Sequence, residues 1–315
     1  MGASIRAKST ATLKNDMDLN DIHHNDFVSM YLPLSWQPYA RLMRVDRPIG
    51  IWLTLFPALA SLFLSGGKIP EFKQILVFSI GAFLMRSAGC VINDIFDRRF
   101  DAYVSRTRSR PLANGSLRLN NALVFLAILL VMAASLLIFL SYAAALLALC
   151  CIPLMFFYPL CKRFTHWPQA FLGATFNWGV LMASVETAGS ITQCALYLWV
   201  GCIFWQLGYD TLYAYSDRLD DLRLGLRSTA VLFADNGKKW VAGFYIMAMC
   251  FWLIAGLTSS GSCSFFIFLI PMSMMLLFQV SQFNVGRPDN CNYLFRSNFH
   301  IGTLLLIGAF SAVIC

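Results

Sequence analysis

Long apolar runs separated by short polar segments occupy most of the chain after residue 48. Each is about 17–22 residues long, the length that an α-helix needs to cross the hydrocarbon core of a bilayer. The alternation of apolar and polar residues that a membrane β-barrel requires does not occur. The pattern predicts an all-α polytopic membrane protein with nine transmembrane helices, at 49–65, 74–93, 121–140, 142–160, 168–187, 194–213, 240–258, 263–283 and 300–315.

The first 40 residues are polar by comparison and carry four aspartates, at positions 16, 18, 21 and 26. No short apolar core with a small-residue cleavage site precedes the first predicted helix, so we expect no cleaved secretory signal. A mitochondrial transit peptide is poor in acidic residues, which also argues against that class of leader. We therefore predict a flexible polar tail over 1–40 and a transmembrane domain over 41–315.

Composition supports the membrane assignment. The chain is 58% hydrophobic and 13% charged, whereas soluble domains carry about 25% charged residues. The net charge of +8 is typical of basic loops on the cytoplasmic side, so no nucleic-acid partner is expected. The ten cysteines are scattered, and their spacing fits neither a zinc site nor a disulfide framework.

The basic residues also predict the orientation. With a cytoplasmic N-terminus, 21 of the 24 Lys and Arg residues fall on the cytoplasmic side. Two of the other three, Lys68 and Lys73, fall in an outside loop, and Arg86 lies within the second predicted helix. Because cytoplasmic loops are enriched in Lys and Arg, this bias favours a cytoplasmic N-terminus. A charge inside a predicted span, such as Arg86, indicates a function, a structural partner or a helix that ends earlier than predicted.

Acidic residues outside the tail are concentrated at two helix ends, after the second and the sixth predicted helices. The groups are Asp94, Asp97 and Asp101, and then Asp210, Asp217, Asp220 and Asp221. Helices separated by an even number end on the same side of the membrane, so both groups face the cytoplasm. At about 100° per residue, the first group spans roughly 60°, and three members of the second, Asp210, Asp217 and Asp221, span roughly 40°. Each group is therefore predicted to form one column on a helix.

Columns of like charge repel, which is costly near a membrane. Mg²⁺ offsets such charge well because it takes carboxylate oxygens and bridges to substrate phosphates. We therefore predict a magnesium-diphosphate site with candidate metal ligands Asp94, Asp97, Asp101, Asp210, Asp217 and Asp221. Arginine and lysine groups bind phosphate, and candidates follow or separate the acidic groups: Arg98, Arg99, Arg106, Arg108, Arg110, Lys162, Arg163, Arg223, Arg227 and Lys238.

The two motifs, NDxxDxxxD at 93–101 and DTxYAxxDxxDD at 210–221, resemble those of the UbiA superfamily of intramembrane prenyltransferases. Similar segments occur at 43–50, 106–112, 158–166 and 225–229, so the resemblance covers about residues 38–315. Within the superfamily, the chain most resembles the branch that prenylates 4-hydroxybenzoate in ubiquinone biosynthesis. The resemblance implies nine transmembrane helices around a central cavity that opens toward the cytoplasm.

The resemblance also implies roles for particular residues. Asp97, Asp101, Asp217 and Asp221 would carry the Mg²⁺-diphosphate, supported by Asn93 and Asp94. Arg163 matches the position proposed to hold the carboxylate of the aromatic acceptor. Tyr158 and Tyr213 could face the allylic cation that forms when diphosphate leaves. The expected substrates are polyprenyl diphosphate and 4-hydroxybenzoate.

Three questions stay open on the sequence alone. The acceptor could instead be haem, a naphthoate, homogentisate or chlorophyllide, and residues 43–50 and 158–166 favour a benzoate by resemblance. A transporter or channel would place its acidic residues near mid-membrane, whereas here they lie at helix ends beside arginines. The acidic tail favours a bacterial inner membrane over the alternative, a mitochondrial inner membrane.

Overall fold

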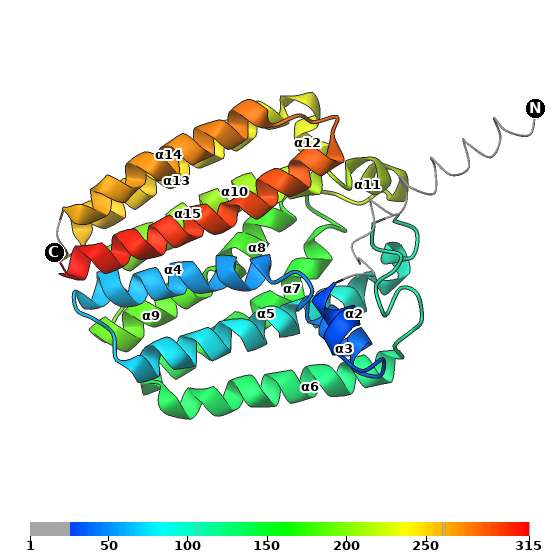
Figure 1. Ribbon diagram of the computed structural model, residues 1–315, viewed down its shortest axis with the longest axis horizontal. Helices are drawn as coiled ribbons and strands as arrows, with labels where there is room; N and C mark the ends of the chain where they lie inside the picture. The colour runs from blue at the N-terminus through cyan, green and yellow to red at the C-terminus, as the bar shows by residue number, and fades with distance from the viewer. Residues whose placement is uncertain (1–25, 105, 260, 262, 315) are drawn as a thin grey trace, which may run out of the picture.

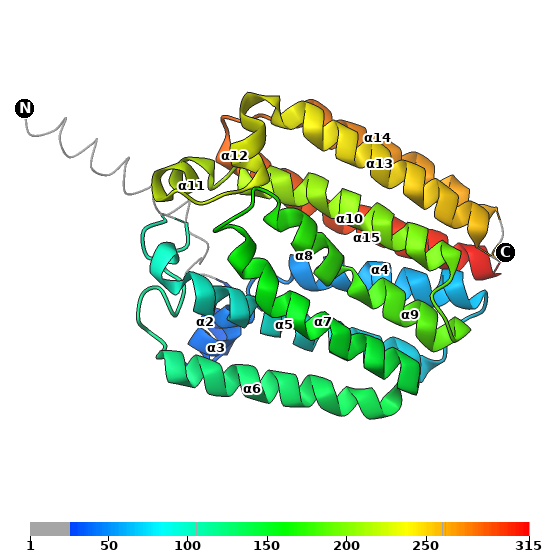
Figure 2. The same cartoon turned by 180° about the vertical axis from the view of Figure 1, so that it is seen from behind.

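The computed structural model describes residues 26–314 except 105, 260 and 262. In this part of the chain the regular structure is helical, and the long helices run side by side in one bundle (Figures 1 and 2). These are α4 (Ile49–Gly66), α5 (Phe72–Asp101), α6 (Leu119–Ser135), α7 (Tyr142–Cys161), α8 (Pro168–Phe176), α9 (Trp178–Ala188), α10 (Gln193–Ala214), α13 (Gly237–Thr258), α14 (Ser264–Gln282) and α15 (Pro288–Ile314).

Short helices lie mainly at one end of the bundle (Figure 1). They are α2 (Phe27–Tyr31), α3 (Gln37–Leu42), α11 (Arg218–Leu224), α12 (Thr229–Phe233) and the 3-10 turns η1 (Leu136–Phe139) and η2 (Ala234–Asn236). Residues 26–40, which we expected to belong to a flexible tail, thus include α2 and most of α3. The rest of the predicted tail, residues 1–25, lies outside the described residues.

Local sequence accounts for the helix starts and stops. Ser141 and Thr192 begin α7 and α10 by accepting hydrogen bonds from backbone N–H groups three residues on, which satisfies donors that the first helical turn leaves free. Gly67 ends α4 with φ at 59°, a left-handed conformation that glycine adopts without strain. Glu71 and Gln74 form a reciprocal capping box at the start of α5.

Four clusters of buried apolar side chains hold the described part of the bundle together, and two of them are much larger than the others. The larger joins α4, α10, α13, α14 and α15 and contains the fully buried indoles of Trp205 and Trp252. The smaller joins α3, α5, α6 and α7. Helix α10 approaches α13 closely at Gly208, where the ring of Tyr245 packs directly on the glycine backbone. Small residues permit such close approach between membrane helices.

Seven helical stretches among the described residues are long and apolar enough to cross a membrane. Each of the nine predicted spans contains helix, but two do not meet that condition. The span predicted at 168–187 is broken at Asn177 into α8 and α9, and α10 is long enough but carries polar residues such as Gln206 and Asp210. The membrane-spanning all-α architecture is confirmed, whereas the number nine stays a prediction.

The last predicted span also begins earlier than expected. We predicted a loop over 284–299, but α15 already starts at Pro288. Proline suits a first helical position because its missing N–H would have had no partner there.

The contact at Gly208 gives a test of the packing. A Cβ at this position would lie 2.6 Å from Cδ1 of Tyr245, whereas one at Gly243 of α13 would meet nothing within 4 Å. We expect Gly208→Ala to lower the free energy of unfolding by ~1–3 kcal/mol through overpacking. The control Gly243→Ala should not destabilise the protein, since alanine favours helix over glycine. Thermal unfolding in detergent measures both, and equal melting temperatures would contradict the packing described here.

Candidate active site

A cavity of about 270 Å³ lies where α5, α7 and α10 end, beneath the loop over 102–118 and α11. Residues far apart in the sequence meet there, including members of both aspartate motifs. Thirteen of the residues singled out from the sequence line it: Arg86, Asn93, Asp97, Asp101, Arg106, Arg110, Tyr158, Lys162, Asp210, Tyr213, Asp217, Asp221 and Arg227. The fold therefore brings the two motifs together, as their placement on one side of the membrane predicted.

The first motif lies on one continuous helix. With 30 residues and a rise of about 1.5 Å per residue, α5 is roughly 45 Å long, against a hydrocarbon core of about 30 Å. Its last turns can therefore project beyond the hydrocarbon and carry Asp94, Asp97 and Asp101 toward the cavity end. Arg98 and Arg99 lie in the final turn of α5, where their positive charges interact favourably with the negative end of the helix dipole.

The second motif does not form the single helical column that we predicted. Helix α10 ends at Ala214, and Asp217 is the N-cap residue of the separate helix α11. Backbone bonds from Ser216 to Tyr213 and from Asp217 to Ala214 span three residues, which tightens the end of α10 and turns the chain. After this turn Asp217 and Asp221 still line the cavity that Asp210 lines, but from a different element.

Basic side chains pair with the carboxylates of the cavity. Arg106 binds Asp217 in bidentate fashion, with N–O distances of 2.7 and 2.5 Å, and its guanidinium also donates to the Tyr213 hydroxyl at 2.5 Å. Lys162, at the end of α7, pairs with Asp97. These ion pairs tie the 102–118 loop to the second motif and α7 to the first.

Asp94 lies behind the cavity rather than on its wall. Its side chain is 1% exposed, and Oδ1 accepts from Arg44 at 2.6 Å and from Arg110 at 3.3 Å. Arg110 also forms an ion pair with Asp101 at 3.0 Å. Because both arginines line the cavity, Asp94 holds two cations at the site from behind. This arrangement favours a supporting role for Asp94 over the metal-ligand role also considered for it.

Arg44 reaches Asp94 from an unusual backbone conformation. Its φ is 62°, in the left-handed region that side chains other than glycine rarely adopt, at a cost of about 1–2 kcal/mol. Such strain is maintained where surrounding interactions require it, often at functional sites. The sequence pattern gave no role to Arg44 individually, although it lies in the 43–50 segment that supported the family resemblance.

The donor set suits a magnesium ion, although no group of three His, Cys, Asp or Glu side chains in the described residues is already gathered around one point. Carboxylate oxygens are the ligands that Mg²⁺ prefers. Asp97 lines the cavity, and its buried Oδ1 has no hydrogen-bond partner among the described residues. A buried carboxylate oxygen without a partner is costly, so a cation bound between the motifs would satisfy it.

The pKa of Asp221, on α11 outside the spans, is raised to about 7. Burial is the largest cause and the charge of Asp217 adds to it, while Lys162 and a hydrogen bond from Ser228 act in the opposite direction. Burial disfavours a charged carboxylate. A cation beside Asp221 would have the opposite effect and favour its ionised form.

Arg163 does not line the cavity in this structure. Its side chain is exposed, donates to the Phe96 carbonyl at 3.2 Å and lies over the ring of Phe100. Its predicted contact with the acceptor therefore has no geometric support here, and the role stays a prediction.

Arg86 occupies a position better suited to an anionic ligand. It bonds to Cys90, lies over the Phe176 ring at 4.8 Å from the centroid and packs against Gly50, which leaves room for it. Among the described residues it forms no ion pair within 4 Å. The only sequence signal for it was a charge within an apolar span.

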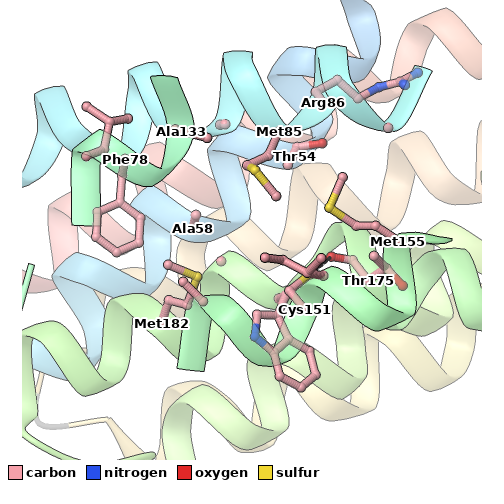
Figure 3. A pocket seen from close by; sticks show the side chains of 18 of the residues that line it. Thr54, Ala58, Phe78, Met85, Arg86, Ala133, Cys151, Met155, Thr175 and Met182 are labelled. Atoms are coloured by element: carbon pink, nitrogen blue, oxygen red, sulfur yellow. Dashed lines mark hydrogen bonds between the residues drawn. The ribbon is translucent and has the colours of Figure 1, made fainter. Parts of the chain in front are cut away.

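A second cavity of about 390 Å³ adjoins the first. Its lining is almost entirely apolar and comes from α4, α5, α6, α7, α8 and α9, and Met85, Met155 and Met182 converge on it (Figure 3). Arg86, Tyr158 and Leu172 line both cavities, so the charged and the apolar space meet at these residues.

The position of Asp94 predicts a stability effect. Removing its charge by Asp94→Asn breaks the buried ion pairs with Arg44 and Arg110, of which Arg110 keeps its pair with Asp101, and breaking a buried pair costs about 3–5 kcal/mol. The control is Asp235→Asn, since Asp235 pairs with Arg218 at 3.4 Å through a side chain that is 95% exposed and exposed pairs contribute about 0–1 kcal/mol. Thermal unfolding should separate the two variants clearly. Equal stabilities would show that Asp94 does not bind these arginines.

Known proteins resemble this chain over most of its length. The 4-hydroxybenzoate polyprenyltransferase, mitochondrial, of Aedes aegypti is 40% identical over 274 residues, covering 86% of this chain and 62% of the mosquito protein. The protein of the same name from Bos taurus is 39% identical over 286 residues, covering 90% of this chain and 77% of the bovine protein. The chain thus spans somewhat less than two thirds of the length of the mosquito relative.

A solved structure supports the fold independently. The UbiA homolog from Archaeoglobus fulgidus bound to GPP and Mg²⁺ superposes with a TM-score of 0.67 at 16% identity, covering 88% of this chain and all of the other. The sequence model of the UbiA prenyltransferase family matches residues 54–304, a range that contains the motifs lining the charged cavity. The chain belongs to the UbiA prenyltransferase family.

Proposed function

We propose that this protein transfers a polyprenyl group from polyprenyl diphosphate to the ring of 4-hydroxybenzoate, ortho to the hydroxyl, in ubiquinone biosynthesis. The observation that carries the proposal is the junction of the two cavities, one charged and one apolar, at Arg86 and Tyr158. A prenyl diphosphate likewise consists of a charged diphosphate and an apolar prenyl chain. The names of the mosquito and bovine relatives supply the acceptor and the polyprenyl donor.

Charge balance supports a diphosphate bound together with Mg²⁺. Five carboxylates and six basic side chains line the charged cavity, so its formal charge is close to neutral. A diphosphate alone would face five repelling carboxylates, and divalent cations alone would face the basic groups. When bound, Mg²⁺ would neutralise charge on the leaving diphosphate. Asp97, Asp101, Asp217 and Asp221 would hold it, with Asp210 beside them.

The basic residues then have a second partner. Arg106, Arg110 and Lys162 pair with carboxylates of the cavity. At this position their guanidinium and ammonium groups would also reach a diphosphate held by the metal, and such groups bind phosphate oxygens well. They would stabilise the negative charge that develops as the allylic C–O bond breaks. Asn93 positions Tyr158 by accepting from its hydroxyl at 3.2 Å.

The apolar cavity suits the prenyl chain. Its lining carries few polar atoms apart from the end at Arg86, so burial of the chain there is favoured by the hydrophobic effect. Excluding water also protects the allylic cation from hydrolysis. In the reaction, diphosphate leaves with the electrons of the broken C–O bond. The C–C bond then forms between the prenyl C1 and the acceptor ring, and the ring loses a proton.

We infer that Arg86 binds the acceptor carboxylate. It lies where the two cavities meet, and thus where the reacting carbon of a prenyl diphosphate would be. Inside a span an arginine favours an anionic partner, and the described residues offer it none within ion-pair distance. Arg163, the residue suggested by resemblance, is the alternative. A benzoate carboxylate at Arg86 would hold the ring beside both substrate subsites.

The protein is integral to a membrane, and we propose a quinone-forming inner membrane as its location. The acidic residues near the N-terminus favour a bacterial inner membrane. The names of the mosquito and bovine relatives include the word mitochondrial, which favours the mitochondrial inner membrane. Fractionation of the source cells with an antibody against the chain distinguishes the two.

The central test is a transfer assay. Membranes containing the protein, incubated with 4-hydroxybenzoate, a polyprenyl diphosphate and Mg²⁺, should form the prenylated acid, and EDTA should stop the reaction until Mg²⁺ is restored. Asp97→Ala and Asp217→Ala should each lower the rate by at least about 100-fold, as expected for a lost electrostatic contact to the transition state. Asp220→Ala is the matched control, since Asp220 belongs to the second motif but does not line the cavity. Near-normal rates in both cavity variants would contradict the metal site. If product forms only with a different acceptor, the chain belongs to another branch of the family.

A comparison of two arginines tests the acceptor subsite. Arg86→Gln should raise KM for 4-hydroxybenzoate by roughly 10- to 100-fold, because a charge-assisted hydrogen bond is worth about 1.5–3 kcal/mol, and KM for the diphosphate should change little. Arg86→Lys should retain part of the affinity. Arg163→Gln should leave both values close to those of the unchanged protein. If Arg163→Gln instead raises KM for the acid and Arg86→Gln does not, the assignment is reversed.

A further inference from the structure

The segment that precedes α4 presents large apolar side chains outward. It consists of α2, the turn at 32–36 and α3. Five side chains over residues 27–36 are between 58% and 83% exposed: Phe27, Met30, Tyr31, Leu34 and Trp36. We call these five residues the outer apolar face. Facing water, such a continuous set of large apolar residues would be unfavourable.

Three polar side chains of the same segment are partly buried and bind one another. Ser29 donates to Asp26 at 2.6 Å, and Arg41 donates to Ser29 at 2.7 Å. The segment also buries Val28 and Leu42 completely, so it is apolar on its inner and on its outer side. A short helix at a water-facing surface normally has a polar outer side. The apolar outer side therefore indicates an apolar environment around the outer apolar face.

The depth of the segment can be read from its contacts with α6. The ring of Tyr39 in α3 lies 5.1 Å from that of Phe125, which is seven residues after Arg118, the N-cap residue of α6. At about 1.5 Å per residue, this contact lies roughly 10 Å along α6 from its polar start. Interfacial helices bury their apolar side about 5–10 Å into the boundary between headgroups and acyl chains. The segment thus lies at the level of that boundary.

The position in the fold agrees with this depth. Figure 1 shows α2 and α3 lying across the ends of α5 and α6, rather than parallel to them. With five and six residues, both are far too short to span a bilayer. The lipid-facing surface of α6 continues at the same level with exposed Leu123 and Val124. Tyrosine and tryptophan, as at positions 31 and 36, are enriched at membrane interfaces.

We propose that the outer apolar face lies in the interfacial layer of the bilayer, in the leaflet at the aspartate end of the bundle. We infer that lipid, not a protein partner, covers it, because α3 packs on α6 at Tyr39 and Phe125, next to Leu123 and Val124, which are exposed apolar residues of a membrane helix. The segment then leads within a few residues to Arg44, which binds Asp94. Lipid contact thereby sets the height of this arginine relative to the membrane surface. The inference requires only membrane residence and does not depend on the acceptor.

Depth-dependent quenching tests the proposal on the full chain in protein-free lipid vesicles. An environment-sensitive fluorescent amino acid replaces Leu34, or as controls Met274, which is 66% exposed near the middle of α14, or the highly exposed Asp235. Lipids brominated near the headgroup should quench the probe at 34 more than lipids brominated near the chain end. The probe at 274 should show the opposite order, and the probe at 235 should lose little emission with either lipid.

A second variant distinguishes loss of the lipid contact at position 34 from loss of folding. With the probe at 34, Tyr31→Glu combined with Trp36→Glu should remove most of the shallow quenching, because charge disfavours the acyl boundary. The probe at 274 in the same background should keep its deep quenching, which shows that the bundle is still inserted. Two results would overturn the proposal: a probe at 34 that no brominated lipid quenches, as expected of a surface for a protein partner, or one that deep bromine quenches most.

Discussion

The pairing of buried carboxylates with basic side chains is the interaction on which the functional end of this protein depends. Carboxylates gathered in a low-dielectric region repel one another and favour protonation unless cations balance them. Here the balancing groups come from separate elements: Arg44 before α4, Arg106 and Arg110 in the 102–118 loop, and Lys162 at the end of α7. Each pair therefore neutralises charge and also fixes one segment of chain over the cavity.

Sequence patterns predicted the features that follow from regular spacing. Apolar runs of spanning length gave the helical membrane architecture, and helical phase placed Asp94, Asp97 and Asp101 on one helix because α5 continues through them. The prediction that Asp210, Asp217 and Asp221 lie on one helix was wrong. It assumed an unbroken helix, whereas the chain turns between Ala214 and Asp217. The missed signal is Asp217 itself, because aspartate is a preferred N-cap residue and can mark the start of a new helix.

Residues whose role depends on contacts across the fold were harder to predict. Arg163 belongs to a recognisable segment, yet its side chain points out of the cavity, while its neighbour Lys162 reaches Asp97. Arg86 had only the signal of a charge in an apolar span, and its value as a site residue comes from lying where two cavities meet. Orientation within a bundle is decided by packing with elements distant in sequence, which a single sequence does not specify.

The left-handed backbone of Arg44 restricts which amino acids this position can tolerate. Glycine would relieve the strain of about 1–2 kcal/mol but would remove the cation that binds Asp94. Lysine would keep a charge without the planar fork of donors, and most other side chains would keep the strain and lose the ion pair. Arginine is thus a compromise between two incompatible demands on one residue. Random mutagenesis should therefore recover very few functional substitutions at position 44, even though its backbone alone would favour glycine.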